Sequence, residues 1–122
     1  MSESRHPHSE RRLRLGLERL GLDVGLTDPL MRYLAELEKW NATYNLSGIK
    51  IVDEMVLRHL LDSLTVLPAV PALVDGTRLI DVGSGAGVPG LVLAIARPGL
   101  KVTTLDSAGK KARFMRHAIR AL

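Results

Sequence analysis

A short apolar run that leads directly into four glycines constrains this chain more than any other feature. The run is "RLIDV" (78–82), the glycine-rich segment is "GSGAGVPG" (83–90), and "VPGLVLAIAR" (88–97) has the composition of a helix. Glycine costs about 0.5–1 kcal/mol relative to alanine inside a regular element, so glycines gather where a backbone must turn sharply or approach a ligand. The pattern predicts a strand, a ligand-binding loop and a helix.

The segment after this loop continues the same alternation. "PGLKVTTLD" (98–106) predicts a turn and a second strand, and "AGKKARFMRHAIRAL" (108–122) predicts an amphipathic helix. Strand, loop, helix, strand and helix in this order are typical of the beginning of a doubly wound α/β sheet. We therefore predict that residues 76–122 form the first β-α-β-α portion of a Rossmann-like domain, with a sheet that is incomplete within this chain. The apolar face of the last helix is expected to comprise Ala112, Met115, Ala118 and Ile119.

The residues ahead of the sheet predict helices alone. The spacing of leucines in "ERRLRLGLERLG" (10–21) predicts a first helix that ends at Gly21. A second helix is expected to be capped by Asp28, with Pro29 at its first position, and to give way to a loop at "NATYNLSG" (41–48).

A third helix is expected to begin near Asp53 and to end at Pro68, because proline interrupts helical hydrogen bonding. A linker rich in proline and glycine follows at "PAVPALVDGT" (68–77). Residues 1–75 are therefore predicted to form an all-helical N-terminal cap.

The glycine-rich loop has the form of a nucleotide cradle. Gly85, Gly87 and Gly90 match G-x-G-x-x-G, and Asp106 follows 21 residues after Gly85, where a carboxylate can bind ribose hydroxyls. Taken alone, this pattern indicates a dinucleotide. Asp81 argues against one, because a carboxylate at the end of the first strand would repel a pyrophosphate. It suits the positively charged S-adenosylmethionine better, while a role as a helix or turn cap is the structural alternative.

Composition and charge narrow the function further. The chain has 122 residues, no cysteine and no apolar run of the roughly 20 residues that a membrane span needs, so a cytoplasmic protein without a membrane partner is expected. No histidine has ligands at metal spacing, so no metal is predicted. Residues 1–75 carry 9 basic and 11 acidic side chains, whereas residues 76–122 carry 8 and 2. The basic last helix indicates binding to a phosphate backbone, or simply a solvated face.

Three segments together resemble the glucose-inhibited division protein B family. They are "KWNATYNLSGI" (39–49), "DEMVLRHLLDSLTVLP" (53–68) and "RLIDVGSGAGVPGLVLAIARP" (78–98), the last continuing into "VTTLDSAGKKARFMR" (102–116). The family comprises bacterial methyltransferases that act on guanine N7 in 16S ribosomal RNA. The resemblance, which extends from about residue 28 to the end of the chain, implies an S-adenosylmethionine-dependent enzyme of this activity, with ribosomal RNA of the small subunit as its partner.

The resemblance also implies residue roles. Val88 takes the place where the family commonly has phenylalanine beside the cofactor, and Asp106 with Ser107 matches the family's "LDS". His59 is expected to face the site. The cofactor-binding residues expected from the resemblance and from the charge of Asp81 are Asp81, Gly83, Gly85, Gly87, Val88, Asp106 and Ser107. The expected RNA-binding residues are Asn45, Arg58, His59, Lys110, Lys111 and Arg113.

Alternatives to these roles stay open. Asn45 could cap a turn, and Arg58 could pair with Asp62 four residues on. The whole chain could instead be a nicotinamide- or flavin-dependent oxidoreductase, or a non-catalytic RNA-binding or assembly module. Because family members are longer, the chain could be an inactive fragment, and the open edge of its sheet is expected to promote self-association. No catalytic acid or base is predicted, since guanine N7 has no proton to lose.

Overall fold

The predicted alternation of strands and helices is present in the C-terminal part of the chain. The computed structural model describes residues 5–83 and 85–121. Strand β1 (Arg78–Val82) and strand β2 (Lys101–Leu105) pair in parallel, with Arg78 opposite Lys101 and Val82 opposite Leu105. Helix α6 (Gly90–Ala96) connects the two strands, and helix α7 (Gly109–Ala121) follows β2. The glycine-rich loop therefore joins a strand to a helix, as predicted.

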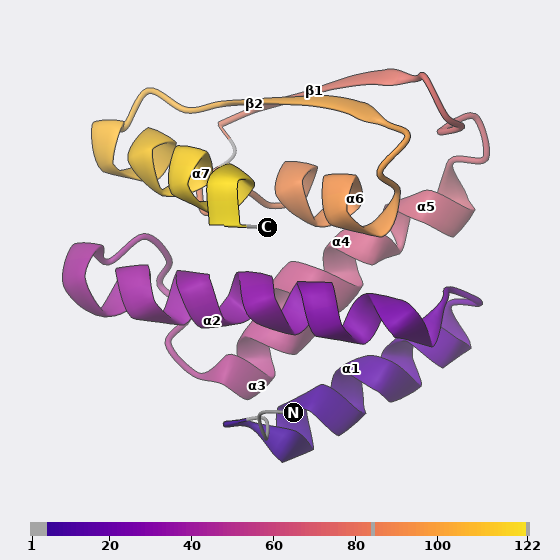
Figure 1. Cartoon of the computed structure of the whole chain (residues 1–122), viewed down its shortest axis with the longest axis horizontal. Coiled ribbons are helices and arrows are strands. Elements are labelled where there is room, and N and C mark those ends of the chain that lie inside the picture. Colours follow the sequence, from indigo (N-terminus) through magenta and orange to yellow (C-terminus); the bar gives the residue numbers. More distant parts are fainter. Residues whose placement is uncertain (1–4, 84, 122) are drawn as a thin grey trace.

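The sheet is covered on one face. Figure 1 shows α6 and α7 beneath the two strands, with α2 and α1 beneath them in turn. No element of the described residues lies over the other face of the sheet in this view. Its outward side chains are accordingly exposed, with Ile80 at 67%, Val82 at 77% and Leu105 at 51% of their full accessibility.

The N-terminal part is helical throughout. Its elements are α1 (Pro7–Arg19), a short 3-10 helix η1 (Val24–Leu26), α2 (Thr27–Tyr44), α3 (Val52–Met55), a π-helix η2 (Val56–Leu61), α4 (Asp62–Leu64) and α5 (Val66–Ala69). Helix α1 begins three residues earlier than expected, at Pro7, because proline is suited to the first turn of a helix. Gly21 follows the end of α1 with a φ of 72°, which is the conformation expected of a residue that ends a helix.

Helix α2 differs from the prediction at both ends. It begins at Thr27, so Asp28 and Pro29 lie within its first turn and neither caps it. The Thr27 hydroxyl donates to the Val24 carbonyl at 2.7 Å. At the other end, the helix continues into the predicted loop as far as Tyr44, because the buried Asn41 bonds Ser47 and Ile49 of the following segment and does not break the helix.

The third helical segment is interrupted, and it continues past Pro68 to Ala69. Pro68 is tolerated because it lies in the first turn of α5, where its missing N–H has no helical acceptor to lose. The ion pair expected between Arg58 and Asp62 is absent, since no Arg58 nitrogen lies within 4.0 Å of an Asp62 carboxylate oxygen in the described structure. The π-helix between them winds more residues into each turn, which changes the i, i+4 register.

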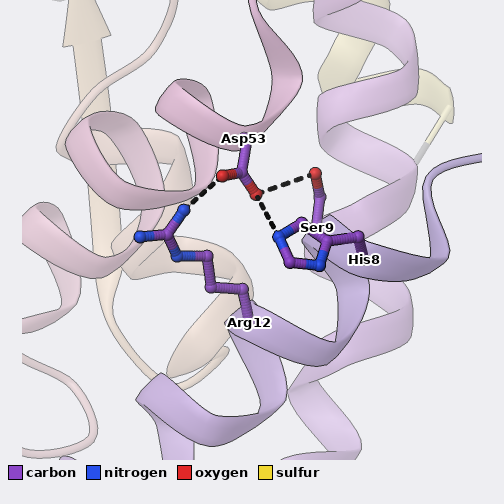
Figure 2. A network of polar contacts seen from close by, with 4 residues as sticks. All are labelled: His8, Ser9, Arg12 and Asp53. Atoms are coloured by element: carbon purple, nitrogen blue, oxygen red, sulfur yellow. Dashed lines mark hydrogen bonds and ion pairs between the residues drawn. The ribbon is translucent and has the colours of Figure 1, made fainter.

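Helix α1 contacts the third helical segment through polar contacts to Asp53 and through close packing at Gly16. Asp53 accepts a hydrogen bond from the Ser9 hydroxyl at 3.2 Å and forms an ion pair with Arg12. Its Oδ1 also lies 4.0 Å from Nε2 of His8 (Figure 2). A Cβ added to Gly16 would lie 2.5 Å from Leu61, so the absence of a side chain permits close packing of α1 on η2.

The hydrophobic core lies between the helical layers. Leu13, Leu30, Leu34, Leu60 and Leu64 are fully or almost fully buried in the N-terminal part. On α7 the buried face differs from the prediction, because Ile119 is 62% exposed and Phe114 is completely buried. The aromatic ring of Phe114 packs against Tyr33 and Trp40 of α2, with centroid distances of 6.3 and 5.7 Å. Helix α7 is thus rotated toward the aromatic side chains of α2.

Candidate functional site

The glycine loop and two aspartates meet where the parallel strands end. We call the set Asp81, Gly83, Gly85, Gly87 and Asp106 the glycine-loop edge. The Gly83 amide donates to the Leu105 carbonyl at 2.7 Å, which continues the pairing of β1 and β2 into the first residue of the loop. The carboxyl ends of parallel strands are where α/β sheets bind ligands, so this edge is the candidate cofactor site.

Two glycines of this edge have different structural needs. Gly87 has a φ of 98°, and an added Cβ would lie 2.6 Å from the Leu91 side chain, so both conformation and space require glycine there. Gly85 has a φ of 60°, but an added Cβ would meet no atom within 4 Å. The backbone at Gly85 therefore borders open space, which is the environment expected where a ligand approaches a loop.

Gly90, the third glycine of the G-x-G-x-x-G pattern, packs the helix against the sheet. A Cβ at Gly90 would lie 2.8 Å from both the Asp81 carboxylate and the Thr104 methyl group. The first turn of α6 can approach the inner face of the sheet only because this position has no side chain.

The Asp106 carboxylate is fixed by the backbone around it. Its Oδ2 accepts from the Gly85 amide and its Oδ1 from the Ala108 amide, each at 2.8 Å. The hydrogen bond from Ala108, then that from Gly85, and the positive charge of Lys111 lower the pKa of Asp106 below its ordinary value. Each carboxylate oxygen has about two acceptor sites, so Asp106 can accept further hydrogen bonds from hydroxyl groups.

Asp81 lies on the inner face of the sheet, beside the loop as the sequence indicates. Its Oδ2 accepts from the Gly90 amide at 2.8 Å, at the first turn of α6. The capping role that the sequence left open for Asp81 is therefore realised in the structure. This bond also directs a carboxylate toward the glycine loop, so its negative charge lies at the candidate site.

The two remaining candidates for the cofactor site each follow a residue of this edge in the sequence, Val88 after Gly87 and Ser107 after Asp106. Val88 is half-buried and packs against the hydrophobic core, whereas Ser107 is exposed directly after Asp106. The structure thus joins Gly85 to Asp106 by one hydrogen bond and Asp81 to Gly90 by another, and leaves Ser107 exposed after β2.

Five cations lie along α7, and four of them are on its exposed side. We call Lys110, Lys111, Arg113, Arg116 and Arg120 the basic face of α7. Lys111 is half-buried and the other four are exposed. Within residues 5–83 and 85–121, none of the five lies within 4.0 Å of a carboxylate oxygen. Their charge is directed to solvent, where a polyanion can reach it.

The other three RNA-binding candidates do not join this face. Asn45 ends α2 in a left-handed conformation and its Oδ1 accepts from Lys50 at 2.5 Å, so its turn-capping alternative is realised. His59 is half-buried, with Nε2 2.9 Å from the Ser47 hydroxyl, and burial lowers its pKa. The contacts of His59 are therefore with the loop after α2. No described contact joins it to the glycine-loop edge.

Arg58 lines an open groove between α1 and η2. The groove has a volume of about 620 Å³ and contains no residue of the glycine-loop edge. Its lining combines charged groups with apolar side chains, namely Gly16, Arg19, Leu20, Leu57, Arg58, Leu61, Asp62 and Thr65.

Tyr33 contributes to the site although it is not among the site residues predicted from the sequence. Its hydroxyl donates to the carbonyl of Ala86, in the middle of the glycine loop, at 2.6 Å. Both residues are buried, although Tyr33 comes from α2, 53 positions away in the sequence. A tyrosine among the leucines of a helix was the one available signal, since a buried phenol needs a hydrogen-bond partner.

Residues 5–83 and 85–121 hold neither a cluster of metal-ligating side chains nor a membrane-spanning helix. No group of three His, Asp or Glu side chains is arranged to hold a metal ion. Among the same residues, no helix has the length and apolar character required to cross a membrane.

Comparisons with known proteins agree with the geometry. The model of a family described as "GidB: rRNA small subunit methyltransferase G" matches residues 27–122. A protein of Stenotrophomonas maltophilia (strain K279a) named "Ribosomal RNA small subunit methyltransferase G" is 57% identical over 110 residues, which are 90% of this chain and 50% of that protein. A protein of the same name from Alkalilimnicola ehrlichii is 58% identical over 106 residues, covering 85% of this chain and 46% of that protein. The chain spans about half the length of the curated relatives it matches.

Proposed function

Because the chain belongs to the GidB family of rRNA small subunit methyltransferases, we propose that it serves S-adenosylmethionine-dependent methyl transfer to guanine N7 of 16S ribosomal RNA. The observation that carries the proposal is the glycine-loop edge of the two-stranded parallel sheet. There a strand, a loop with a glycine bordering open space, and two carboxylates converge.

The donor and acceptor groups of this edge fit adenosylmethionine better than a dinucleotide. Asp106 retains acceptor capacity for ribose hydroxyls beyond its bonds to Gly85 and Ala108. Asp81 places a second carboxylate near the loop, which favours the ammonium and sulfonium charges of adenosylmethionine and disfavours a pyrophosphate. The backbone at Gly85 leaves room for the ligand to approach.

Methyl transfer to guanine N7 requires no proton transfer by a side chain. Adenosylmethionine, when bound, would supply the methyl group of its sulfonium, and its sulfur would retain the electron pair of the broken sulfur–carbon bond. N7 has a lone pair and no proton, so the chain needs no general base. Its residues would bind the cofactor, orient it toward the base and exclude water, which are the contributions that speed a displacement of this kind.

The basic face of α7 is the proposed contact with ribosomal RNA. Lysine and arginine side chains with no carboxylate partner attract phosphates and release the counterions bound to them. Helix α7 directly follows Asp106 and Ser107 along the chain, so a strand of RNA held on this face would lie near the end of β2. The contacts found for Asn45 and His59 support structural roles for these two residues, and leave Arg58 as an independent candidate on the groove of α1.

A titration distinguishes the proposal from its alternatives. We expect adenosylhomocysteine, the product of the reaction, to bind the chain in calorimetry, and NAD not to bind. Binding of NAD alone would favour an oxidoreductase, and binding of 16S rRNA fragments without adenosylhomocysteine would favour a non-catalytic RNA-binding module. Transfer of labelled methyl from adenosylmethionine to guanine N7 of 16S rRNA tests the activity itself.

We also propose that the open edge of the sheet associates with a second copy of this chain. Among the described residues β1 pairs only with β2, and an edge strand with unpaired backbone groups is a template for association. The exposed apolar side chains of Ile80, Val82 and Leu105 beside this edge would add to the contact. Sedimentation should show a dimer that dissociates when Val82 is changed to Asp. A monomer at all concentrations would contradict the proposal.

A further inference from the structure

The buried hydroxyl of Tyr33 is the only described tertiary side-chain contact to a carbonyl of the glycine loop. It bonds the Ala86 carbonyl at 2.6 Å, and both residues are almost fully inaccessible to solvent. Ala86 lies between Gly85 and Gly87, the two glycines whose φ values of 60° and 98° shape the loop. A bond at this point therefore restrains the backbone on both sides.

The environment of Tyr33 keeps this bond formed. Burial raises the pKa of the phenol well above its ordinary value, so the hydroxyl is protonated and can donate at neutral pH. The ring packs against Phe114 of α7, with centroids 6.3 Å apart, which fixes the direction of the hydroxyl. A buried Ala86 carbonyl without a hydrogen-bond donor would raise the free energy of the folded loop. The bond from Tyr33 therefore stabilises this conformation of the loop.

Helix α2 holds the basic helix as well as the loop. Glu36, one turn after Tyr33, bonds His117 of α7 at 2.6 Å between Oε2 and Nε2. One segment of the N-terminal helical part thus contacts both the candidate cofactor loop and the helix proposed to bind RNA. This arrangement gives the helical part a role beyond covering the sheet.

We propose that Tyr33 is a positioning residue for the cofactor: its hydroxyl holds the Ala86 carbonyl and so keeps Gly85 and Gly87 in the conformation that admits the ligand. The inference rests on the proposed function for the identity of that ligand. Tyr33 itself is buried behind the loop backbone and acts through Ala86.

The test compares Tyr33→Phe with Tyr44→Phe in the full 122-residue chain. Both variants lose one hydroxyl and keep the ring, but Tyr44 is 42% exposed and has no bond to the loop. In Tyr33→Phe we expect hydrogen exchange at the Gly85, Gly90 and Leu91 amides, which bond Asp106, Asp81 and Gly87, to accelerate about tenfold. Exchange at the Leu20 amide of α1 should not change, and Tyr44→Phe should resemble the wild type.

Calorimetry with adenosylhomocysteine supplies the functional readout. We expect its Kd to rise about tenfold in Tyr33→Phe and to stay unchanged in Tyr44→Phe, at a temperature where circular dichroism shows both variants folded. Equal acceleration of exchange throughout the chain, or an unchanged Kd and unchanged loop exchange, would overturn the inference.

Two further outcomes are separable. If the wild type fails to bind adenosylhomocysteine, the proposed function fails for this chain, while loop exchange still decides whether Tyr33 holds the loop. If Tyr33→Phe does not fold, the Tyr33 hydroxyl proton of the wild type is followed by NMR. We expect a slowly exchanging resonance that shifts on addition of adenosylhomocysteine, and a resonance that does not move would overturn the inference.

Discussion

The glycine-loop edge and the basic face of α7 are close neighbours in the chain, but they are built in different ways. At the edge, Asp81 and Asp106 accept three backbone hydrogen bonds of 2.8 Å, and Gly87 has no room for a side chain. On α7 the lysines and arginines have no carboxylate within 4.0 Å among the described residues. The first region depends on backbone geometry at short range, and the second on charge at long range.

This difference implies that the two regions can be damaged separately. A change of shape at the edge should remove cofactor binding and leave RNA binding intact, and a change of charge on α7 should do the reverse. Salt should weaken only the second, because contacts with a phosphate backbone release counterions.

The largest expected effect is that of Gly85→Val on the edge. A β-branched side chain would fill the open space beside the loop and would strain a backbone with a φ of 60°. Calorimetry should show adenosylhomocysteine affinity falling by about 100-fold or more, equivalent to about 2.7 kcal/mol. Gly21→Val is the matched control, because Gly21 also has a positive φ and open space but lies after α1. Equal losses in the two variants would mean that strain alone explains the effect.

Charge reversal on α7 should have the next largest effect, and mainly on RNA. Replacing Lys110, Lys111 and Arg113 by Glu should weaken binding of a 16S rRNA fragment by about 30-fold at low salt and lower the salt slope by about 2 to 3. The Kd for adenosylhomocysteine should rise much less, by the loss of the Lys111 charge that acts on Asp106. Reversing Arg11, Arg14 and Lys101, which are exposed outside this face, should leave RNA affinity nearly unchanged. Equal effects of the two triple variants would show that net charge, and no particular face, attracts RNA.

A smaller effect is expected for Asp81→Asn. The amide still accepts from the Gly90 amide, so the fold should persist, but the negative charge near the ligand is lost. Adenosylhomocysteine affinity should fall by about fivefold to tenfold, the equivalent of about 1 kcal/mol. Asp23→Asn is the control, since Asp23 also accepts one backbone N–H at 2.8 Å but caps η1. Unchanged affinity in Asp81→Asn would reduce Asp81 to a helix cap.

The smallest effect concerns pH. Because the pKa of Asp106 is lowered in the folded chain, its contribution to loop stability is present above the unfolded value of about 3.8 and is lost as pH falls through the lower folded value. Exchange at the Gly85 amide should therefore be independent of Asp106 titration between pH 7 and 5, after correction for the intrinsic rate. A loss of protection within that range would show that the hydrogen bonds from Ala108 and Gly85 do not hold the ionised carboxylate.

Much of the fold could be read from local patterns. The bounds of β1 follow from five residues of "RLIDV" placed directly before a glycine, and α7 follows from its amphipathic spacing, because strand and helix periodicity are local properties of a chain. The position of the glycine loop between β1 and α6 was predictable for the same reason, since glycine marks the places where the backbone must turn. The charge of α7 is likewise a property of composition alone.

Other features depended on which surfaces meet in three dimensions. Sequence spacing could not show that Phe114 would be buried and Ile119 exposed, because the orientation of α7 is set by the aromatic side chains of α2. The extension of α2 to Tyr44 depended on Asn41, whose amide donates to the Ile49 carbonyl at 3.2 Å and accepts from the Ser47 amide at 2.7 Å. Local propensity assigns such an asparagine to a turn, and only a buried partner reverses that preference.

For the site, the sequence alone determined which residues have the chemistry: the glycines, the two aspartates and the lysines and arginines of α7. The tertiary structure decided how they are held. Asp81 accepts a hydrogen bond from the first backbone N–H of α6, and Asp106 accepts hydrogen bonds from the backbone N–H groups of Gly85 and Ala108. The bond from Tyr33 to Ala86 joins residues 53 positions apart. Periodicity and propensity report on a few neighbouring residues, whereas a hydrogen bond between distant segments exists only after packing has brought its donor and acceptor together.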